Sequence, residues 1–368
     1  MIKLVHVIFA AAILLSACSV GKGRNRTYLC WLSFLVLFLF SALRYDFGND
    51  YMSYYNNFVA IKHGNWSAYG SQYVFTLINY LSPSFPFLVA VTSFLFLWAV
   101  YRLLKDHLPP EHIWLGLFVF LFSPYIFLMN LSAMRQCLAM LLFMLAIPRA
   151  ASMSTKGFVR YAALILLASF IHKSAILLLP VYFFANNKSI KRLHMGLIFA
   201  ATALLLLSEN LFPTLVSSVL SIFDDKNYVD YFAFGAKNSL RSILLSLIPV
   251  AYLLLNASRV PERNLVYTKL SVASYLLSIL AFQNNVLIRM RMYFEIFSVV
   301  AVPMTYFAVK ELLPEEKEPL GAGRRFFLII NRYALPALVF LIYLLKYYNF
   351  FQEPVWEPFL TYKTILWR

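Results

Sequence analysis

Residues 84–104 read SFPFLVAVTSFLFLWAVYRLL, an apolar run in which Arg102 is the single charged residue. Coiled into an α-helix, a run of this length extends about 30 Å, which is the thickness of the hydrocarbon core of a bilayer. Similar runs recur along the chain and predict an all-α, polytopic membrane protein with about twelve transmembrane helices. The predicted spans lie near 2–20, 27–43, 84–104, 112–130, 134–148, 158–171, 174–186, 194–209, 240–256, 265–282, 292–310 and 327–347.

The overall composition agrees with a membrane protein. Of the 368 residues, 61% are hydrophobic and 13% are charged, and the mean hydropathy is +0.71. A soluble domain has about 45–50% apolar and about 25% charged residues. No linker or internal repeat divides the sequence, so we expect a single integral-membrane domain over residues 1–368. The stretch 70–82, which ends before Pro83, predicts a surface or re-entrant helix.

The net charge of +16 does not indicate nucleic-acid binding. The Lys and Arg residues lie in short gaps between apolar runs, as the positive-inside rule predicts, and they form no basic stripe. If the basic gap GKGRNR at 21–26 is cytoplasmic, three polar segments face the other side of a bacterial inner membrane, the periplasm. These outer-face segments are 44–82, 209–239 and 347–368, and we expect amphipathic helices and the function there.

The N-terminus imitates a lipoprotein signal. Residues 1–18 end in LSAC, and cleavage there would leave Cys18 as the lipidated first residue. The basic gap at 21–26 and the apolar run that follows it favour a retained first helix instead. Cys18, Cys30 and Cys137 lie in apolar surroundings without metal-ligand spacing, and nothing in the sequence requires a metal or another cofactor.

The segment RYDFGNDYMSYYNNF at 44–58 is the densest polar cluster next to a predicted span. An Arg such as Arg44 can bind phosphate, a carboxylate such as Asp46 or Asp50 can act as a base, and Tyr51 and Tyr54 can stack on sugar rings. The alternative is a helix end with a snorkelling Arg, a local ion pair and a belt of tyrosines.

Three further motifs place ionisable groups near the outer ends of predicted helices, where such groups are costly and usually functional. In LSAMRQCLAM at 131–140, Arg135 opposes the positive-inside trend, and its alternative role is to anchor lipid headgroups. In FIHKSAILLLP at 170–180, His172 is a candidate base or a structural link between helices.

The last motif is NNVLIRMRMYFEIF at 284–297, with Arg289 and Arg291. Two residues apart on a helix, these arginines diverge by about 200° and cannot share a face. One is predicted to bind substrate, Arg289 being the more outward, while Arg291 pairs with Glu295 four residues on. Arginines outnumber carboxylates at membrane depth, which indicates an anionic ligand and not a metal cation.

Taken in order, these motifs resemble the EpsG family of bacterial exopolysaccharide proteins, relatives of Wzy-type O-antigen and capsule polymerases. The resemblance rests on RYDFGNDYMSYY at 44–55, MRQCLAM at 134–140, FIHKSA at 170–175 and RMRMYFE at 289–295, with PVWEPFLTYKTIL at 354–366. It implies a GT-C-like glycosyltransferase. The enzyme would move a growing glycan from undecaprenyl diphosphate onto a new undecaprenyl-diphosphate-linked repeat on the periplasmic face.

This implied reaction gives each candidate residue a role. The predicted catalytic residues are Asp50, Arg135, His172 and Arg289, and the predicted substrate-binding residues are Arg44, Asp46, Tyr51, Tyr54 and Arg291. The expected partners are undecaprenyl-diphosphate-linked glycans, membrane lipids, a chain-length regulator and a flippase, and no nucleic acid. Three alternatives stay open: a flippase for lipid-linked oligosaccharides, an O-antigen ligase, and a non-enzymatic scaffold of an export complex.

Overall fold

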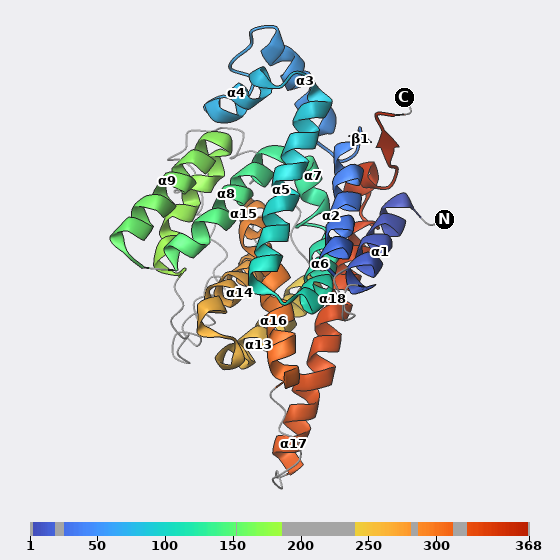
Figure 1. Cartoon of the computed structure of the whole chain (residues 1–368), viewed down its shortest axis with the longest axis vertical. Helices are drawn as coiled ribbons and strands as arrows, with labels where there is room; N and C mark the ends of the chain where they lie inside the picture. The colour runs from blue at the N-terminus through green and yellow to red at the C-terminus, as the bar shows by residue number, and fades with distance from the viewer. Residues whose placement is uncertain are drawn as a thin grey trace. The chain divides into compact units, whose positions relative to one another are not determined.

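The computed structural model of the chain describes residues 3–18, 26–151, 153–185, 240–280, 286–311 and 322–366 (Figure 1). These residues are almost entirely helical, which confirms the predicted all-α class. The chain divides into two compact units, one made of Met1–Asn186 with Tyr343–Arg368 and the other of Asn187–Ile342. The predicted span at 194–209 and the predicted outer-face segment at 209–239 lie outside the described residues.

The first unit is a bundle in which helices close together in sequence and helices far apart in sequence pack side by side. Helix α1 packs on α2 and α6, α2 on α5, α5 on α8, and α8 on α9. The helices of this unit are α1 (Leu4–Ala17), α2 (Arg26–Ala42), α3 (Tyr51–Lys62), α4 (Tyr73–Leu81), α5 (Phe85–His107), α6 (Ile113–Phe122), α7 (Leu128–Ser132), α8 (Met134–Ala150) and α9 (Thr155–Ile171). Short 3₁₀ segments are η2 (Pro110–His112), η3 (Lys173–Phe183) and η7 (Pro354–Phe359).

The second unit is centred on α14, which packs on α13, α15 and α16. Its elements are α13 (Leu240–Leu255), η4 (Ala257–Arg259), η5 (Glu262–Asn264), α14 (Leu265–Leu280), α15 (Val286–Glu295), α16 (Ser298–Glu311), α17 (Ala322–Ile329) and the π-helical η6 (Ile330–Ala334). Helix α18 (Leu335–Phe350) follows η6. The buried amides of Asn256 and Asn331 exchange hydrogen bonds of 2.8 and 2.6 Å, which satisfies both groups in the apolar interior.

Two helices in the described ranges are long and apolar enough to cross a membrane, Phe85–His107 and Arg325–Phe350. A third is present if Arg289–Glu295 and Ser298–Lys310, which meet at a bend of 42°, form one broken span. The remaining apolar helices are shorter, among them Leu4–Ala17 and Tyr28–Ala42. The described helices therefore do not confirm the predicted number of twelve spans.

Several predicted spans differ from the structure for local reasons. Residues 112–130 are not one helix, because α6 ends where Ser123 turns extended before Pro124, and a residue before proline disfavours the α conformation. In the predicted span at 174–186, residues up to Phe183 belong to the 3₁₀ helix Lys173–Phe183, with Pro180 inside it, instead of an α-helical span. Hydropathy detects the apolar content of such runs and does not detect where a helix is interrupted. The predicted short helix at 70–82 is confirmed as α4.

The C-terminal tail covers the polar segment that follows α2. Strand β1 (Arg44–Tyr45) pairs antiparallel with β2 (Lys363–Thr364). Tyr362 stacks on Phe40 at 4.6 Å between ring centroids and donates a 2.7 Å hydrogen bond to the Phe40 carbonyl. These contacts bring the predicted outer-face segments 44–82 and 347–368 together, so both lie on the same side of the first unit.

Gly48 is closely packed between the C-terminal tail and the end of α7. Its φ is +96°, and a Cβ built there would lie 3.3 Å from the Phe359 ring and 3.3 Å from Ser132 Oγ. Glycine adopts a positive φ without steric cost, whereas other residues pay about 1–3 kcal/mol. The glycine thus allows the chain to turn between the tail and the α7–α8 loop.

We predict that Gly48→Ala lowers the thermal unfolding temperature of the detergent-solubilised protein more than Gly64→Ala does. Gly64 has a similar φ of +93°, and nothing lies within 4 Å of a Cβ built there. An alanine at position 64 therefore meets the backbone strain of a positive φ without steric crowding. The difference between the two variants then reports crowding against Phe359 and Ser132. An equal shift in both variants would contradict the close packing at Gly48.

Candidate functional site

Two of the sequence motifs, 44–58 and 131–140, meet in the first unit. The Arg44 guanidinium donates a 3.0 Å hydrogen bond to the Leu131 carbonyl. The Asp50 backbone N–H donates to Ser132 Oγ at 2.9 Å. These contacts run in parallel order along both segments, so the segment after α2 is attached to the end of α7.

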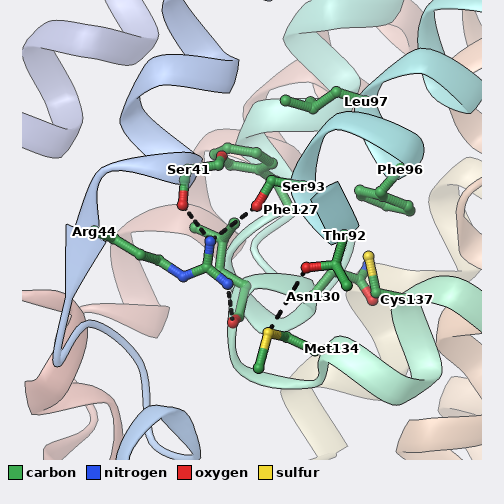
Figure 2. Close-up of a pocket in the computed structure, with 11 residues that line it drawn as sticks. Ser41, Arg44, Thr92, Ser93, Phe96, Leu97, Phe127, Asn130, Met134 and Cys137 are labelled. Carbon is green, nitrogen blue, oxygen red and sulfur yellow. Dashed lines mark hydrogen bonds between the residues drawn. The ribbon is translucent and has the colours of Figure 1, made fainter. Parts of the chain in front are cut away.

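Arg44 lies at the buried end of this junction, with 1% of its surface exposed. Nη1 donates to the Ser41 carbonyl and, at 3.0 Å, to Ser93 Oγ, while Nη2 reaches Leu131 (Figure 2). One guanidinium therefore joins the end of α2, the middle of α5 and the end of α7. The pocket beside it is lined by Ser41, Arg44, Thr92, Ser93, Phe96, Leu97, Phe127, Asn130, Leu131, Met134 and Cys137. It has room for about one water molecule, so no sugar or diphosphate fits there.

Arg135 lies at the outer end of the junction, at the start of α8, and is half-buried. Its guanidinium carbon is 4.9 Å from the centroid of the Tyr69 ring and 5.7 Å from that of Tyr54. Arg135 Nε and the Arg135 backbone N–H also donate to the Tyr54 hydroxyl at 3.4 and 3.3 Å. Aromatic faces attract a cation, and this attraction is stronger away from water. The two tyrosines thus hold a guanidinium at the edge of the bundle.

The two tyrosines are themselves part of the core. Tyr54 and Tyr69 are each 5% exposed and pack with Phe75, Met134 and Ile171 in one apolar cluster. Burial raises the pKa of Tyr69, so its hydroxyl stays neutral beside the arginine. Tyr69 was not selected from the sequence, because a tyrosine in the turn before α4 reads as one more member of an aromatic belt.

The predicted bases occupy different surroundings. Asp50 is half-buried at the start of α3, and its carboxylate does not cap that helix. Asp46 forms a 2.8 Å ion pair with Lys363 on the tail, which raises the pKa of Lys363. His172 is buried and follows Ile171, a member of the cluster that holds the tyrosines beside Arg135. Asp50 is therefore attached to the junction through its backbone N–H. His172 directly follows, in sequence, a residue of the apolar cluster that contains Tyr54 and Tyr69.

The structure places Tyr51 and Tyr54 in the core and not on the surface. Tyr51 is 2% exposed, and its ring lies edge-on to Phe85 at 5.2 Å and to Tyr45 at 5.8 Å. Protein side chains thus cover the ring faces that the sequence prediction assigned to sugar stacking. Ser132, which the sequence motif LSAMRQCLAM contains, was missed as the partner of the Asp50 amide.

The arginines at 289 and 291 belong to the second unit. Arg291 is 8% exposed, and its Nε lies 2.9 Å from Glu295 Oε2 in a buried ion pair that confirms the predicted pairing. Arg291 Nη1 also donates to Ser278 Oγ at 3.3 Å. Arg289 is exposed, so the two arginines point to different faces of α15, as their spacing predicts. The charge of Arg291 is balanced by Glu295, which disfavours a direct role in binding an anion.

A comparison with known protein families shows the family to which the chain belongs. The EpsG family matches residues 27–312, which include the junction, His172 and both arginines of α15. The chain belongs to the EpsG family. No curated protein and no solved structure matches it. Together with its apolar helices, membership identifies this EpsG protein as a membrane protein of polysaccharide biosynthesis.

The family match includes the junction and does not include the C-terminal tail that covers it. The contacts among Arg44, Asp50, Tyr54 and the 131–135 loop lie within the matched residues, whereas the tail that pairs with β1 lies beyond them. The junction is therefore a feature of the EpsG portion of the chain. The tail adds a cover over it through Tyr362 and Lys363.

We predict that Arg44→Lys destabilises this EpsG protein by about 2 kcal/mol or more, because one ammonium group cannot span Ser41, Ser93 and Leu131 as a guanidinium does. The measurement is thermal unfolding in detergent. Arg102→Lys is the matched control, since Arg102 forms an exposed pair with Asp106 and should change stability by less than about 0.5 kcal/mol. Equal effects in the two variants would contradict the joining role of Arg44.

Proposed function

We propose that this EpsG protein is a polymerase of lipid-linked polysaccharide repeat units, of the O-antigen, capsule or exopolysaccharide kind. It transfers the growing glycan from undecaprenyl diphosphate to a new undecaprenyl-diphosphate-linked repeat. The protein is a multi-pass protein of the bacterial inner membrane, with about twelve GT-C-like spans and its active face in the periplasm. The observation that carries this proposal is the guanidinium of Arg135, held by Tyr54 and Tyr69 beside the loop that binds Asp50.

The leaving group explains the need for an arginine. When the acceptor oxygen attacks the anomeric carbon, the bond from that carbon to the phosphate oxygen breaks, and its electron pair stays on the lipid diphosphate. Arg135 stabilises this developing charge. A positioned donor of this kind contributes about 10²–10³ in rate when it is held in place before the reaction. The contacts with Tyr54 and Tyr69 supply such positioning.

The acceptor hydroxyl must lose its proton as the new glycosidic bond forms. Asp50 is the base that we propose, because it is half-buried and its backbone is fixed to the end of α7, directly before the helix α8 that carries Arg135. Asp46 is committed to Lys363, and an ion pair makes a carboxylate a weaker base. His172 is the second candidate, because it follows a residue of the cluster behind Arg135.

The buried residues have supporting roles in this proposal. Arg44 positions the end of α7, which leads into α8 with Arg135, and Tyr54 orients the Arg135 guanidinium. Tyr51 packs the first turn of α3 against Phe85. In the second unit, the buried ion pair between Arg291 and Glu295 stabilises helix α15. Arg289 remains a separate proposal for contact with an anionic substrate, supported by its exposure.

We predict that Arg135→Ala lowers polymer formation at least about hundredfold in a deletion strain complemented with the variant. Single lipid-linked repeats should accumulate, and thermal unfolding of the purified variant tests whether it folds. Arg135→Lys retains the charge without the planar donor geometry and should restore part of the activity. Arg102→Ala, which removes an exposed arginine, is the matched control.

The same assay separates the other functions. Full-length polymer with Arg135→Ala would overturn the assignment and favour a scaffold. Polymer that is made but stays on its lipid carrier would indicate a ligase. Repeats that accumulate only on the cytoplasmic side would indicate a flippase. Arg289→Ala is measured alongside, with loss of polymer expected at normal protein levels.

We predict that Asp50→Asn reduces polymer formation by about 10²–10⁴, because the amide keeps the side-chain shape and cannot accept the proton. The backbone N–H that binds Ser132 is unchanged, so thermal stability should be close to that of the unaltered protein. His172→Gln is the comparison variant. A larger loss with His172→Gln than with Asp50→Asn would transfer the role of base to the histidine.

A further inference from the structure

Helix α4 buries its polar residues Thr76 and Asn79, and one of its faces exposes large apolar and aromatic residues. The buried side is Phe75, Thr76 and Asn79, at 0%, 1% and 0% exposed. The exposed side is Tyr73, Leu77, Tyr80 and Leu81, at 66%, 47%, 46% and 69%. These exposed residues follow the spacing i, i+4, i+7 and i+8, so they form one face of the helix.

The buried polar side chains turn back onto their own helix. Asn79 Nδ2 donates to the Phe75 carbonyl at 2.7 Å, and Thr76 Oγ1 donates to the Gln72 carbonyl at 3.3 Å. A helix at a water surface places such residues outward and leucines inward. The outer face of α4 therefore suits an apolar medium and not bulk water.

The helices that α4 contacts indicate which medium this is. Helix α4 packs on α3, α5 and α9 and crosses the direction of α5 at the end where α5 begins (Figure 1). Helix α5 is one of the described helices long and apolar enough to span a membrane. Phe87 in the first turn of α5 and Phe170 in the last turn of α9 are about half exposed. The exposed apolar side chains of α4 thus occur beside the end of a predicted span.

The edge of this face has the composition of a membrane interface. Trp66, in the turn before α4, lies 4.7 Å from Tyr80 between ring centroids, and both rings are exposed. Lys62 at the end of α3 places its ammonium 5.5 Å from the centroid of the Tyr80 ring. Trp, Tyr and Lys gather at the headgroup level of bilayers, where an apolar body and a polar tip are both satisfied.

We propose that α4 is an interfacial membrane anchor: its face of Tyr73, Leu77, Tyr80 and Leu81 lies in the boundary between lipid headgroups and acyl chains. Lys62 and Trp66 lie at the headgroup level, and the exposed side of α3, which includes Ser53 and Asn56, faces water. This surface is independent of the reaction proposed above. Its consequence is that Tyr69, directly before α4, holds Arg135 close to the depth of lipid phosphates.

The test uses nitroxide labels on the full chain in vesicles of phosphatidylethanolamine and phosphatidylglycerol. Leu77→Cys carries the label on the proposed lipid face, and Asn56→Cys carries the matched label on α3. Cys18 is replaced by Ser because it is exposed, whereas Cys30 and Cys137 are buried. Collision rates with oxygen, which enters the acyl region, and with a water-soluble nickel chelate are measured by electron paramagnetic resonance.

We expect the label at position 77 to collide several-fold more with oxygen than with the nickel chelate, and the label at 56 to show the reverse. A ratio at 77 equal to that at 56 would place α4 in water and overturn the proposal. Low collision rates with both agents would mean that protein covers the face, which also overturns it. Shielding at 77 only after glycan is added would indicate a sugar platform instead. If Leu77→Cys does not fold, Leu81→Cys replaces it under the same criteria.

Discussion

A guanidinium taken out of water costs several kcal/mol unless its donors find acceptors, and Arg44 meets that demand with groups from three helices. The carbonyl of Ser41, the hydroxyl of Ser93 and the carbonyl of Leu131 come from α2, α5 and α7. Because these acceptors must converge on one planar group, the ends of these helices have little freedom to shift. The Ser132 hydroxyl that binds the Asp50 amide and the first turn of α8 with Arg135 follow directly from Leu131. The geometry of the candidate site is thus set by the need to satisfy a buried charge.

The first unit buries some polar residues in its largely apolar core and exposes some large apolar residues. Arg44 and Asn79 are buried, whereas Leu77, Leu81, Phe87 and Phe94 are exposed. In water this distribution would forgo hydrophobic burial and leave apolar surface uncovered. In lipid the exposed apolar side chains lose nothing, since acyl chains are as apolar as leucine. The buried side chains of Arg44 and Asn79 donate hydrogen bonds to groups of nearby helices or of their own helix. The arrangement of α4 and the solvation of Arg44 therefore have the same physical origin.

The sequence alone predicted the features that depend on local composition. Apolar runs located α2, α5 and α9 to within a few residues, and the charge density at 44–58 and 131–140 selected segments that do meet. Composition could not predict which of the selected side chains are covered, because burial depends on contacts far apart in sequence. Tyr54 is buried by Tyr69 and Phe75, and Asp46 is paired with Lys363, which is 317 positions away. Interruptions such as Ser123 before Pro124 were missed because a hydropathy average includes the residues that end a helix.

Three of the four arginines singled out in the sequence, Arg44, Arg135 and Arg291, differ in the groups that surround their charge, and this difference bears on what each can do. Glu295 balances Arg291 with a full opposite charge, so an incoming phosphate would have to displace a buried carboxylate. Carbonyl and hydroxyl oxygens surround Arg44 in a pocket with room for about one water molecule, so a diphosphate cannot reach it. The rings of Tyr54 and Tyr69 attract Arg135 and hold its guanidinium at a half-buried position. In the proposed reaction, a developing diphosphate charge requires a guanidinium that is held in place beforehand, and the contacts of Arg135 with Tyr54 and Tyr69 support that role.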